Sequence, residues 1–183
     1  MRRDADHSFA DAGEHTVKNV AEPVHAWRLE VDGEAAPAAE AQAVEKSSIA
    51  VLPFDNMSRD DDQEYFSDGI TEDIITALSR YRWLTVIARN STFTYKGKAV
   101  DVAQVGRELG VRYVLEGSVR RAGNRVRITA QLIEAAGAGH IWAERYDREL
   151  DDIFALQDEI TETIVVAIEP KLGAAERARA HAK

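Results

Sequence analysis

Cysteine is absent from the 183 residues of this chain. Its absence excludes disulfide bonds, thiolate metal ligands and cysteine nucleophiles, and it leaves the redox compartment open. No apolar run approaches the roughly 18 residues that a membrane-spanning helix needs. The first residues, Met1–Ala10, carry two arginines but lack the apolar core of a secretory signal. We therefore expect a cytoplasmic protein.

Basic charge is also scarce. Lys and Arg number 23 against 32 Asp and Glu, which gives a net charge of −9 and a pI near 5.1. This balance argues against generic binding to nucleic acids or to membrane surfaces. Apolar residues make up 45% and charged residues 30% of the chain, which is ordinary for a globular protein. The length predicts one domain, with room for an appendage.

Signatures of common catalytic and metal sites are missing too. There is no Gly-rich phosphate loop, no nucleophile elbow and no HExxH pair. The acidic run "RDDDQE" at 59–64 lacks the glycine that an EF-hand loop needs at its sixth position, so we expect a solvated loop. Five histidines are scattered without metal-ligand spacing: His7, His15, His25, His140 and His181. The sequence predicts no catalytic residue, no metal ligand and no cofactor.

After a linker-like Ala/Glu/Pro stretch at 34–45, strand and helix patterns alternate along the chain. Ser48–Phe54, "SIAVLPF", predicts a buried strand, and so does Leu84–Asn90, "LTVIARN". Between them, Tyr65–Tyr81 has apolar residues at spacings of three and four, which predicts an amphipathic helix. Gly69 inside this helix suggests a close approach to a neighbouring strand.

The second half of the chain continues with a short helix and a meander. Asp101–Leu109 predicts the helix, with Asp101 as its N-cap and Gly110 as its terminator. A hairpin turning at Gly123–Asn124 follows, with Val126, Ile128, Ala130 and Leu132 on one face.

The last two expected elements are a strand and a helix. The strand "HIWAERYDR" places Trp142 and Tyr146 on one side. The amphipathic helix spans Asp151–Leu172, and Pro170 is expected to kink or end it. Removal of the chain beyond Gly173 is therefore expected to be nearly neutral for stability.

The order of these elements predicts an α/β fold. Strands joined through helices run parallel with right-handed crossovers, and the last three strands form an antiparallel meander. We expect a mixed five-stranded sheet, with two β-α-β crossovers, covered by helices and preceded by a short β remnant and a linker.

Polar residues follow the two predicted parallel strands. Ligands of open α/β sheets collect beyond the carboxyl ends of such strands. The candidate ligand-binding residues are Asp55, Asn56, Arg89, Asn90 and Ser91. The alternative is local turn capping by the Asn and Ser side chains together with an Asp–Arg pair.

A basic cluster surrounds the predicted hairpin: Arg120, Arg121, Arg125 and Arg127. A β-ribbon with such residues can enter a DNA major groove. The alternative is a solvated sheet face whose arginines pair with acidic neighbours, and the acidity of the whole domain favours it.

Several longer segments carry a family resemblance, among them "IAVLPFDNMS", "QEYFSDGITEDIITALSR" and "VGRELGVRYVLEGSVRRAGNRVRITAQLIEA". From Ile49 to about Ala174 the chain resembles the TolB N-terminal-like (FlgO/TolB-like) domain of bacterial class III adenylate/guanylate cyclase fusions and tetratricopeptide (TPR) proteins. It departs from that pattern at "SRDDDQEYF" and "AAGAGH".

The opening of the chain carries a second resemblance. "DAGEHTVKNVAEPVHAWRL" is similar to the final strands of a class III cyclase catalytic domain. The two resemblances imply a cyclase remnant at 1–32, a linker at 33–46, a TolB-like domain at 47–174 and a tail at 175–183 leading toward TPR repeats.

The function that these resemblances imply is a non-catalytic interaction or sensory domain that relays or modulates signals between cyclase and TPR regions. Its partners would be other domains of the same parent protein or separate proteins, with no membrane. Two alternatives stay open: cyclic nucleotide synthesis by the parent protein, and a nucleic-acid-binding regulatory module.

Overall fold

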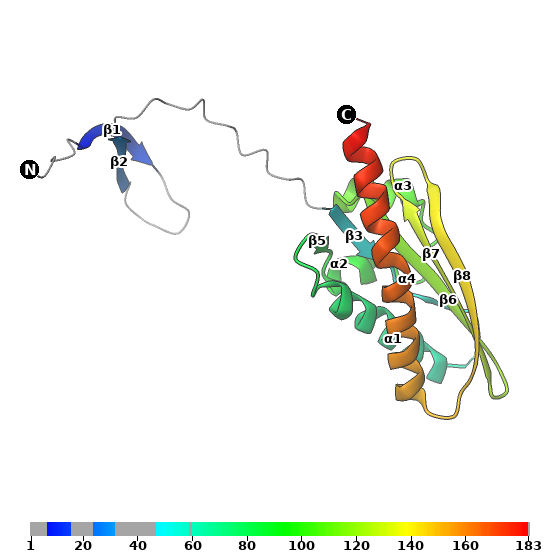
Figure 1. Ribbon diagram of the computed structural model, residues 1–183. Helices are drawn as coiled ribbons and strands as arrows, with labels where there is room; N and C mark the ends of the chain where they lie inside the picture. Colours follow the sequence, from blue (N-terminus) through cyan, green and yellow to red (C-terminus); the bar gives the residue numbers. More distant parts are fainter. Residues whose placement is uncertain (1–6, 16–23, 32–46, 59, 183) are drawn as a thin grey trace, which may run out of the picture. The chain divides into compact units, whose positions relative to one another are not determined.

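The computed structural model describes residues 7–15, 24–31, 47–58 and 60–182 (Figure 1). The chain divides into two compact units, Met1–Val44 and Glu45–Lys183. In the first unit, strands β1 (His7–His15) and β2 (Val24–Val31) pair antiparallel. This ribbon is the short β segment expected before the main domain.

The second unit is built on a mixed sheet of six strands. Five of them lie in the order β5-β3-β6-β7-β8. Their bounds are β3 Ser47–Val51, β5 Leu84–Val86, β6 Tyr113–Ala122, β7 Arg125–Glu134 and β8 Gly139–Glu149. The two-residue strand β4, Asp55–Asn56, pairs parallel with β6 and makes the sixth. The predicted α/β class is confirmed, and β4 is the strand that the prediction of five omitted.

The sheet combines the predicted parallel and antiparallel parts. Strand β3 runs parallel to both β5 and β6, while β7 runs antiparallel to β6 and β8. The predicted inner face of β7 is buried, from Val126 to Leu132. Trp142 and Tyr146 of β8 are buried as well. The two-residue periodicity therefore indicated correctly which face of the meander enters the core.

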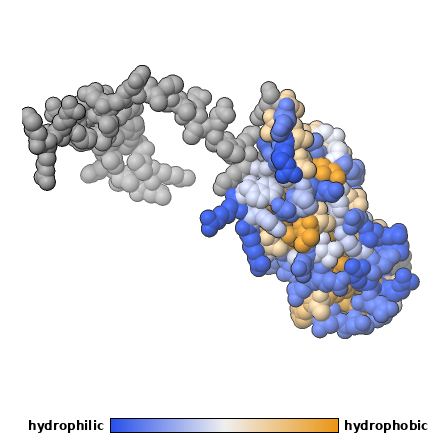
Figure 2. All heavy atoms as spheres, in the orientation of Figure 1, coloured by the Kyte–Doolittle hydropathy of each residue, from blue (hydrophilic) through white to orange (hydrophobic). Residues whose placement is uncertain are grey.

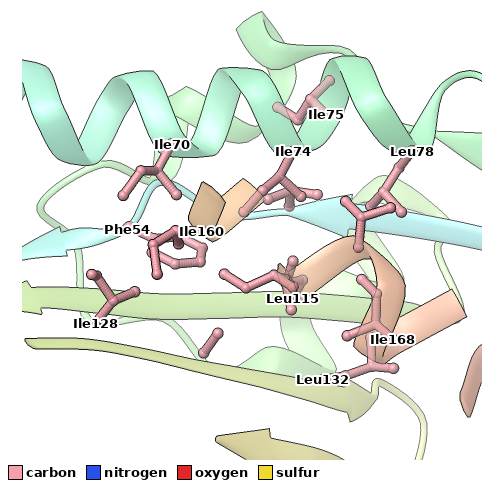
Figure 3. Packing of buried hydrophobic residues seen from close by; sticks show 14 of the residues in the cluster. Phe54, Ile70, Ile74, Ile75, Leu78, Leu115, Ile128, Leu132, Ile160 and Ile168 are labelled. Atoms are coloured by element: carbon pink, nitrogen blue, oxygen red, sulfur yellow. The ribbon is translucent and has the colours of Figure 1, made fainter. Parts of the chain in front are cut away.

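Helices α1 (Asp62–Leu78) and α4 (Ile153–His181) cover one face of the sheet (Figure 1). The main core lies between them and the strands. The close-up in Figure 3 shows α1 side chains such as Ile70 and Ile74 pointing at Leu115 and Ile128 of the sheet. Ile160 and Ile168 of α4 enter the same core.

Gly69 marks a close approach of α1 to α4, and the expectation of a neighbouring strand is wrong. A Cβ atom at Gly69 would lie 1.8 Å from Nε2 of Gln157 in α4. The glycine thus makes room for the buried side chain of Gln157 where the two helices meet.

Helix α3 (Val102–Leu109) packs on the opposite face of the sheet, over Ala50 and Val114. Its predicted ends are confirmed. The Asp101 side chain accepts a hydrogen bond from the backbone N–H of Ala103 at 3.0 Å. Gly110 closes the helix with a φ of 64°. This left-handed conformation is readily available to glycine.

The strand predicted at Leu84–Asn90 is shorter than expected. The backbone N–H of Ile87 still donates to the carbonyl of Ile49 at 2.9 Å, and then the chain turns. Helix α2 (Arg89–Thr92) and a 3-10 turn at Phe93–Tyr95 follow at once. Apolar composition alone does not reveal this early turn, because Val86 and Ile87 suit either conformation.

Helix α4 does not end at Pro170, so the prediction of an end there is wrong. Proline removes one backbone donor from a helix. Here that loss is outweighed by packing on both sides, because Ile168 and Leu172 are fully buried. The helix continues to His181.

Candidate functional site

The five predicted ligand residues follow two strands of the sheet: Asp55 and Asn56 come after β3, and Arg89, Asn90 and Ser91 come after β5. Asp55 is exposed in β4 opposite Ser118 of β6. Asn56 instead closes a turn: its Oδ1 accepts from the backbone N–H of Ser58 at 2.9 Å, and its Nδ2 donates to the carbonyl of Asp60 at 3.0 Å. For Asn56 the turn-capping alternative therefore describes the contacts.

Arg89, the first residue of α2, contacts an acidic side chain of α1 and an aromatic ring. Its Nε lies 3.3 Å from Oε2 of Glu72 in α1, and its guanidinium carbon lies 4.0 Å from the centre of the Phe93 ring. Asn90 and Ser91 are exposed in α2. The carboxylate partner of Arg89 is thus Glu72 and not Asp55, and a shared ligand site at these five residues stays a prediction.

Asp55 does line a polar hollow of about 300 Å³ on the sheet face opposite α1 and α4. The sheet contributes Glu116, Ser118, Thr129 and Gln131, and the segment after α2 contributes Tyr95 and Lys98. Nε2 of Gln131 donates to Oε1 of Glu116. Because these two polar groups already bind each other, part of the hollow's hydrogen-bonding capacity is taken up internally.

Two of the four hairpin arginines, Arg121 and Arg127, have acidic neighbours, as the second interpretation of this cluster proposed. Arg127 forms two hydrogen bonds with the carboxylate of Asp147, at 2.7 and 3.1 Å. The pKa of Asp147 is lowered by this pairing. Arg121 binds the carbonyl of Gly123 at 2.8 Å and lies 3.8 Å from Asp60.

One carboxylate, that of Glu176, connects helix α4 to the start of β3 and to the start of β6. Its oxygens accept from Nη1 of Arg112 at 2.8 Å and from the Tyr113 hydroxyl at 2.6 Å, and it also hydrogen-bonds Ser47. Burial alone would raise the pKa of Glu176, but these hydrogen bonds outweigh it and lower the pKa. Burial and the bond to Glu176 raise the pKa of Tyr113. We call this arrangement the Glu176 clasp.

The clasp lies where the sheet domain begins and ends. Ser47 is the first residue of β3, Tyr113 is the first residue of β6, and Arg112 comes directly before it. Figure 1 shows the start of β3 and the end of α4 at the same end of the second unit. Sequence reasoning missed the clasp for two reasons. Arg112 and Tyr113 lie more than 60 residues before Glu176 in the chain. Glu176 also lies beyond Pro170, where the helix was expected to kink or end.

A second hollow lies between the two long helices. This α1–α4 groove, of about 650 Å³, is lined by Asp73, Thr76, Ala77, Arg80, Tyr81, Asp158, Thr161, Glu162, Val165 and Val166. Burial raises the pKa of Asp73, and the charges of Asp158 and Glu72 raise it further. The face that bears α1 and α4 is largely hydrophilic with small apolar areas, as Figure 2 shows.

Sequence reasoning missed the groove as well. The one available signal is the spacing of Asp158 and Glu162, which puts two carboxylates on one side of α4 beside Val165 and Val166. The α1 half cannot be added from sequence, because it requires the packing of two helices that lie far apart in the chain.

In the parts of the chain that the structure describes, no group of three or more His, Asp or Glu side chains is placed to hold a metal ion. None of the helices there is both long and apolar enough to cross a bilayer.

Comparison with known families decides the membership of the chain. The family described as "HilA/YgeH-like transcriptional regulator, second domain" matches residues 45–163. The chain belongs to this family. The match covers β3 through the first part of α4, and therefore the whole six-stranded sheet together with α1 and α3.

A relative from Rhizobium meliloti (strain 1021), named "Putative adenylate cyclase 3", is 59% identical over 180 residues. The alignment covers 95% of this chain and 31% of the relative, so the chain spans about a third of that protein's length.

A solved structure shows the same fold at low sequence identity. Lipoprotein GNA1162 from Neisseria meningitidis matches with a TM-score of 0.50 and 20% identity, covering 67% of this chain and 96% of its own. TolB from Acinetobacter baumannii matches with a TM-score of 0.48 and 18% identity, covering 69% of this chain and 29% of its own. The specific FlgO/TolB-like assignment stays a prediction.

Proposed function

We propose that the second unit is a non-catalytic interaction domain of a multidomain signalling protein, and that it relays or modulates signals between the regions on either side of it. The observation that carries this proposal is the Glu176 clasp. If α4, the last helix of the domain, is displaced, the contacts of Glu176 with Ser47 and Arg112 change. The displacement is thereby transmitted to the start of β3 and to the start of β6.

The relatives support an interaction role over a catalytic one. The family is named for transcriptional regulators, whereas the Rhizobium meliloti relative is named as an adenylate cyclase. Proteins with such different outputs share this domain, so we infer that it contributes interactions and leaves the chemistry to other regions. Cyclic nucleotide synthesis would then belong to a longer parent protein.

An activity assay tests the non-catalytic part of the proposal. The purified chain is incubated with ATP or GTP together with Mg²⁺ or Mn²⁺, and cyclic nucleotide is measured. We expect no product, since class III cyclases, which the opening segment resembles, act through metal-binding carboxylates that this chain's sequence does not present as a motif. Robust product formation would overturn this part of the proposal.

A double-mutant cycle tests the clasp itself. Tyr113→Phe removes only the hydroxyl, and Glu176→Ala removes the acceptor. We expect the two changes to be non-additive in the free energy of unfolding by about 1 kcal/mol, the coupling usual for groups in one hydrogen-bond network. Additive effects would show that the observed contact carries no coupling. Lys171→Ala, which changes an exposed residue of the same helix, supplies the control pair with Tyr113→Phe.

A further inference from the structure

The lining of the α1–α4 groove carries a net negative charge. Asp73 of α1 and Asp158 and Glu162 of α4 all line it, and Arg80 is the single cation in its lining. Among the described residues, no Lys, Arg or His lies within 4.0 Å of these three carboxylates. A surface of this sign favours a bound cation. The pKa of Asp73 is raised first by burial and then by the charges of Asp158 and Glu72.

A buried hydroxyl in the same groove points to a ligand independently of the charge. Thr161 is 8% exposed and lines the groove, yet its Oγ1 has no hydrogen-bond partner among the described residues. Buried hydroxyls are almost always hydrogen-bonded, and leaving one unpaired is costly. A donor from a bound molecule would supply the missing partner.

Apolar side chains lie directly beside the charged ones. Val166 is 65% exposed although it is aliphatic, and the buried Val165 lies next to it in the lining. Ala77 of α1 and Tyr81, which follows this helix, supply further apolar surface. The groove therefore offers carboxylates and an aliphatic surface side by side, which suits a ligand that has a cation close to an apolar group.

We propose that the α1–α4 groove binds a segment of a protein partner that carries a lysine or arginine next to an apolar side chain. The cation lies among Asp73, Asp158 and Glu162, an N–H of the segment donates to Oγ1 of Thr161, and the apolar side chain covers Val166. An elongated groove between two helices accommodates a helical or extended segment. This inference rests on the proposed interaction role and names the class of partner.

Peptide binding tests the proposal on the whole chain. The probe is a fluorescently labelled synthetic amphipathic peptide of leucine and lysine, and fluorescence anisotropy measures its affinity. One control peptide has glutamate in place of lysine, and another has serine in place of leucine. We expect the leucine–lysine peptide to bind more tightly than both controls, with an affinity that falls as salt rises. Equal binding of the glutamate peptide would overturn the proposal.

Groove variants locate the site. We expect Asp158→Asn combined with Glu162→Gln to weaken binding about tenfold, the effect of losing one or two charge-assisted hydrogen bonds. Val166→Ser is expected to weaken it by roughly threefold. The matched controls are Glu149→Gln and Phe154→Ser, which change exposed residues outside the groove and should leave the affinity unchanged. If the controls weaken binding as much as the groove variants, the proposal is wrong.

Thr161→Val separates a ligand role from a structural one. The substitution keeps the shape of the side chain and removes the unpaired hydroxyl. We expect the melting temperature of the free chain to stay the same or rise, while peptide affinity falls. A lower melting temperature with unchanged affinity would contradict the assigned role of the hydroxyl.

A second copy of the chain is the competing occupant. Sedimentation would then show a dimer that Asp158→Asn with Glu162→Gln dissociates, and that result would overturn the assignment to a separate partner. The clasp contains no groove residue, so a failure of peptide binding with an intact Tyr113–Glu176 coupling overturns the groove alone and not the proposed relay.

Discussion

Single residues decide the most consequential contacts of this domain, and few of them are visible in the sequence. The N-cap Asp101 and the terminator Gly110 follow from local rules, because both act within one turn of their own helix. The role of Glu176 follows from no local rule, since its partners Arg112 and Tyr113 lie more than 60 residues away in the chain.

The pH dependence of stability tests the charge state of Glu176. Its folded pKa lies below its usual value of 4.5, so its contribution is present above about pH 4.5 and is lost as the pH falls through the folded value. At neutral pH, Glu176→Gln should lower the free energy of unfolding by about 1–2 kcal/mol, since bonds to a charged acceptor are replaced by weaker ones. Denaturant titrations at several pH values measure this. A difference between the two proteins that persisted unchanged into strong acid would refute the assigned ionisation.

At the scale of elements, hydrophobic periodicity predicted most of the helices and strands, and capping residues predicted where helix α3 begins and ends. The α1 stripe and the alternation of β7 have clear periods that tertiary packing preserves. The errors occur where a local signal competes with packing. Pro170 is a strong local signal against a helix, but Ile168 and Leu172 are buried on either side of it.

Truncation of α4 tests whether its last turns belong to the fold. The chain cut after Gly173 loses Glu176 and with it the contacts to Arg112 and Tyr113. These contacts reverse the expectation from sequence, and we expect the truncated domain to be less stable by about 1–3 kcal/mol. Urea unfolding provides the measurement, and an unchanged midpoint would mean that the end of α4 is dispensable.

The central part of the same helix provides a reference for that loss. Ile160 is 0% exposed in the main core, so Ile160→Ala should cost about 2–5 kcal/mol. Phe154→Ala, at a side chain that is 75% exposed, should cost far less. Equal costs for the two substitutions would contradict the placement of α4 on the sheet.

At the scale of the whole molecule, the sequence predicted the class of the fold better than its sites. Strand order follows from connection rules, because β-α-β units and hairpins admit few arrangements. The α1–α4 groove and the Glu176 clasp each combine residues from elements far apart in the chain, and no local pattern links such residues.

The two units of the chain should be thermodynamically separable. A sheet of two strands such as β1–β2 is marginal on its own, whereas the second unit holds a complete core. Deleting residues 1–46 should therefore leave the thermal midpoint within about 2 °C of that of the whole chain. Calorimetry measures this, and a large loss of stability would show that the first unit supports the second.

The central claim is that α4 and β3, the last helix and the first strand of the domain, are coupled. Hydrogen exchange in the Glu176→Ala variant tests this claim most directly. The account predicts faster exchange not only in the last turns of α4 but also at Ser48–Val51 of β3 and at the start of β6, with Lys171→Ala as the unaffected control. Faster exchange confined to α4, with β3 and β6 as slow as in the unmodified chain, would contradict it.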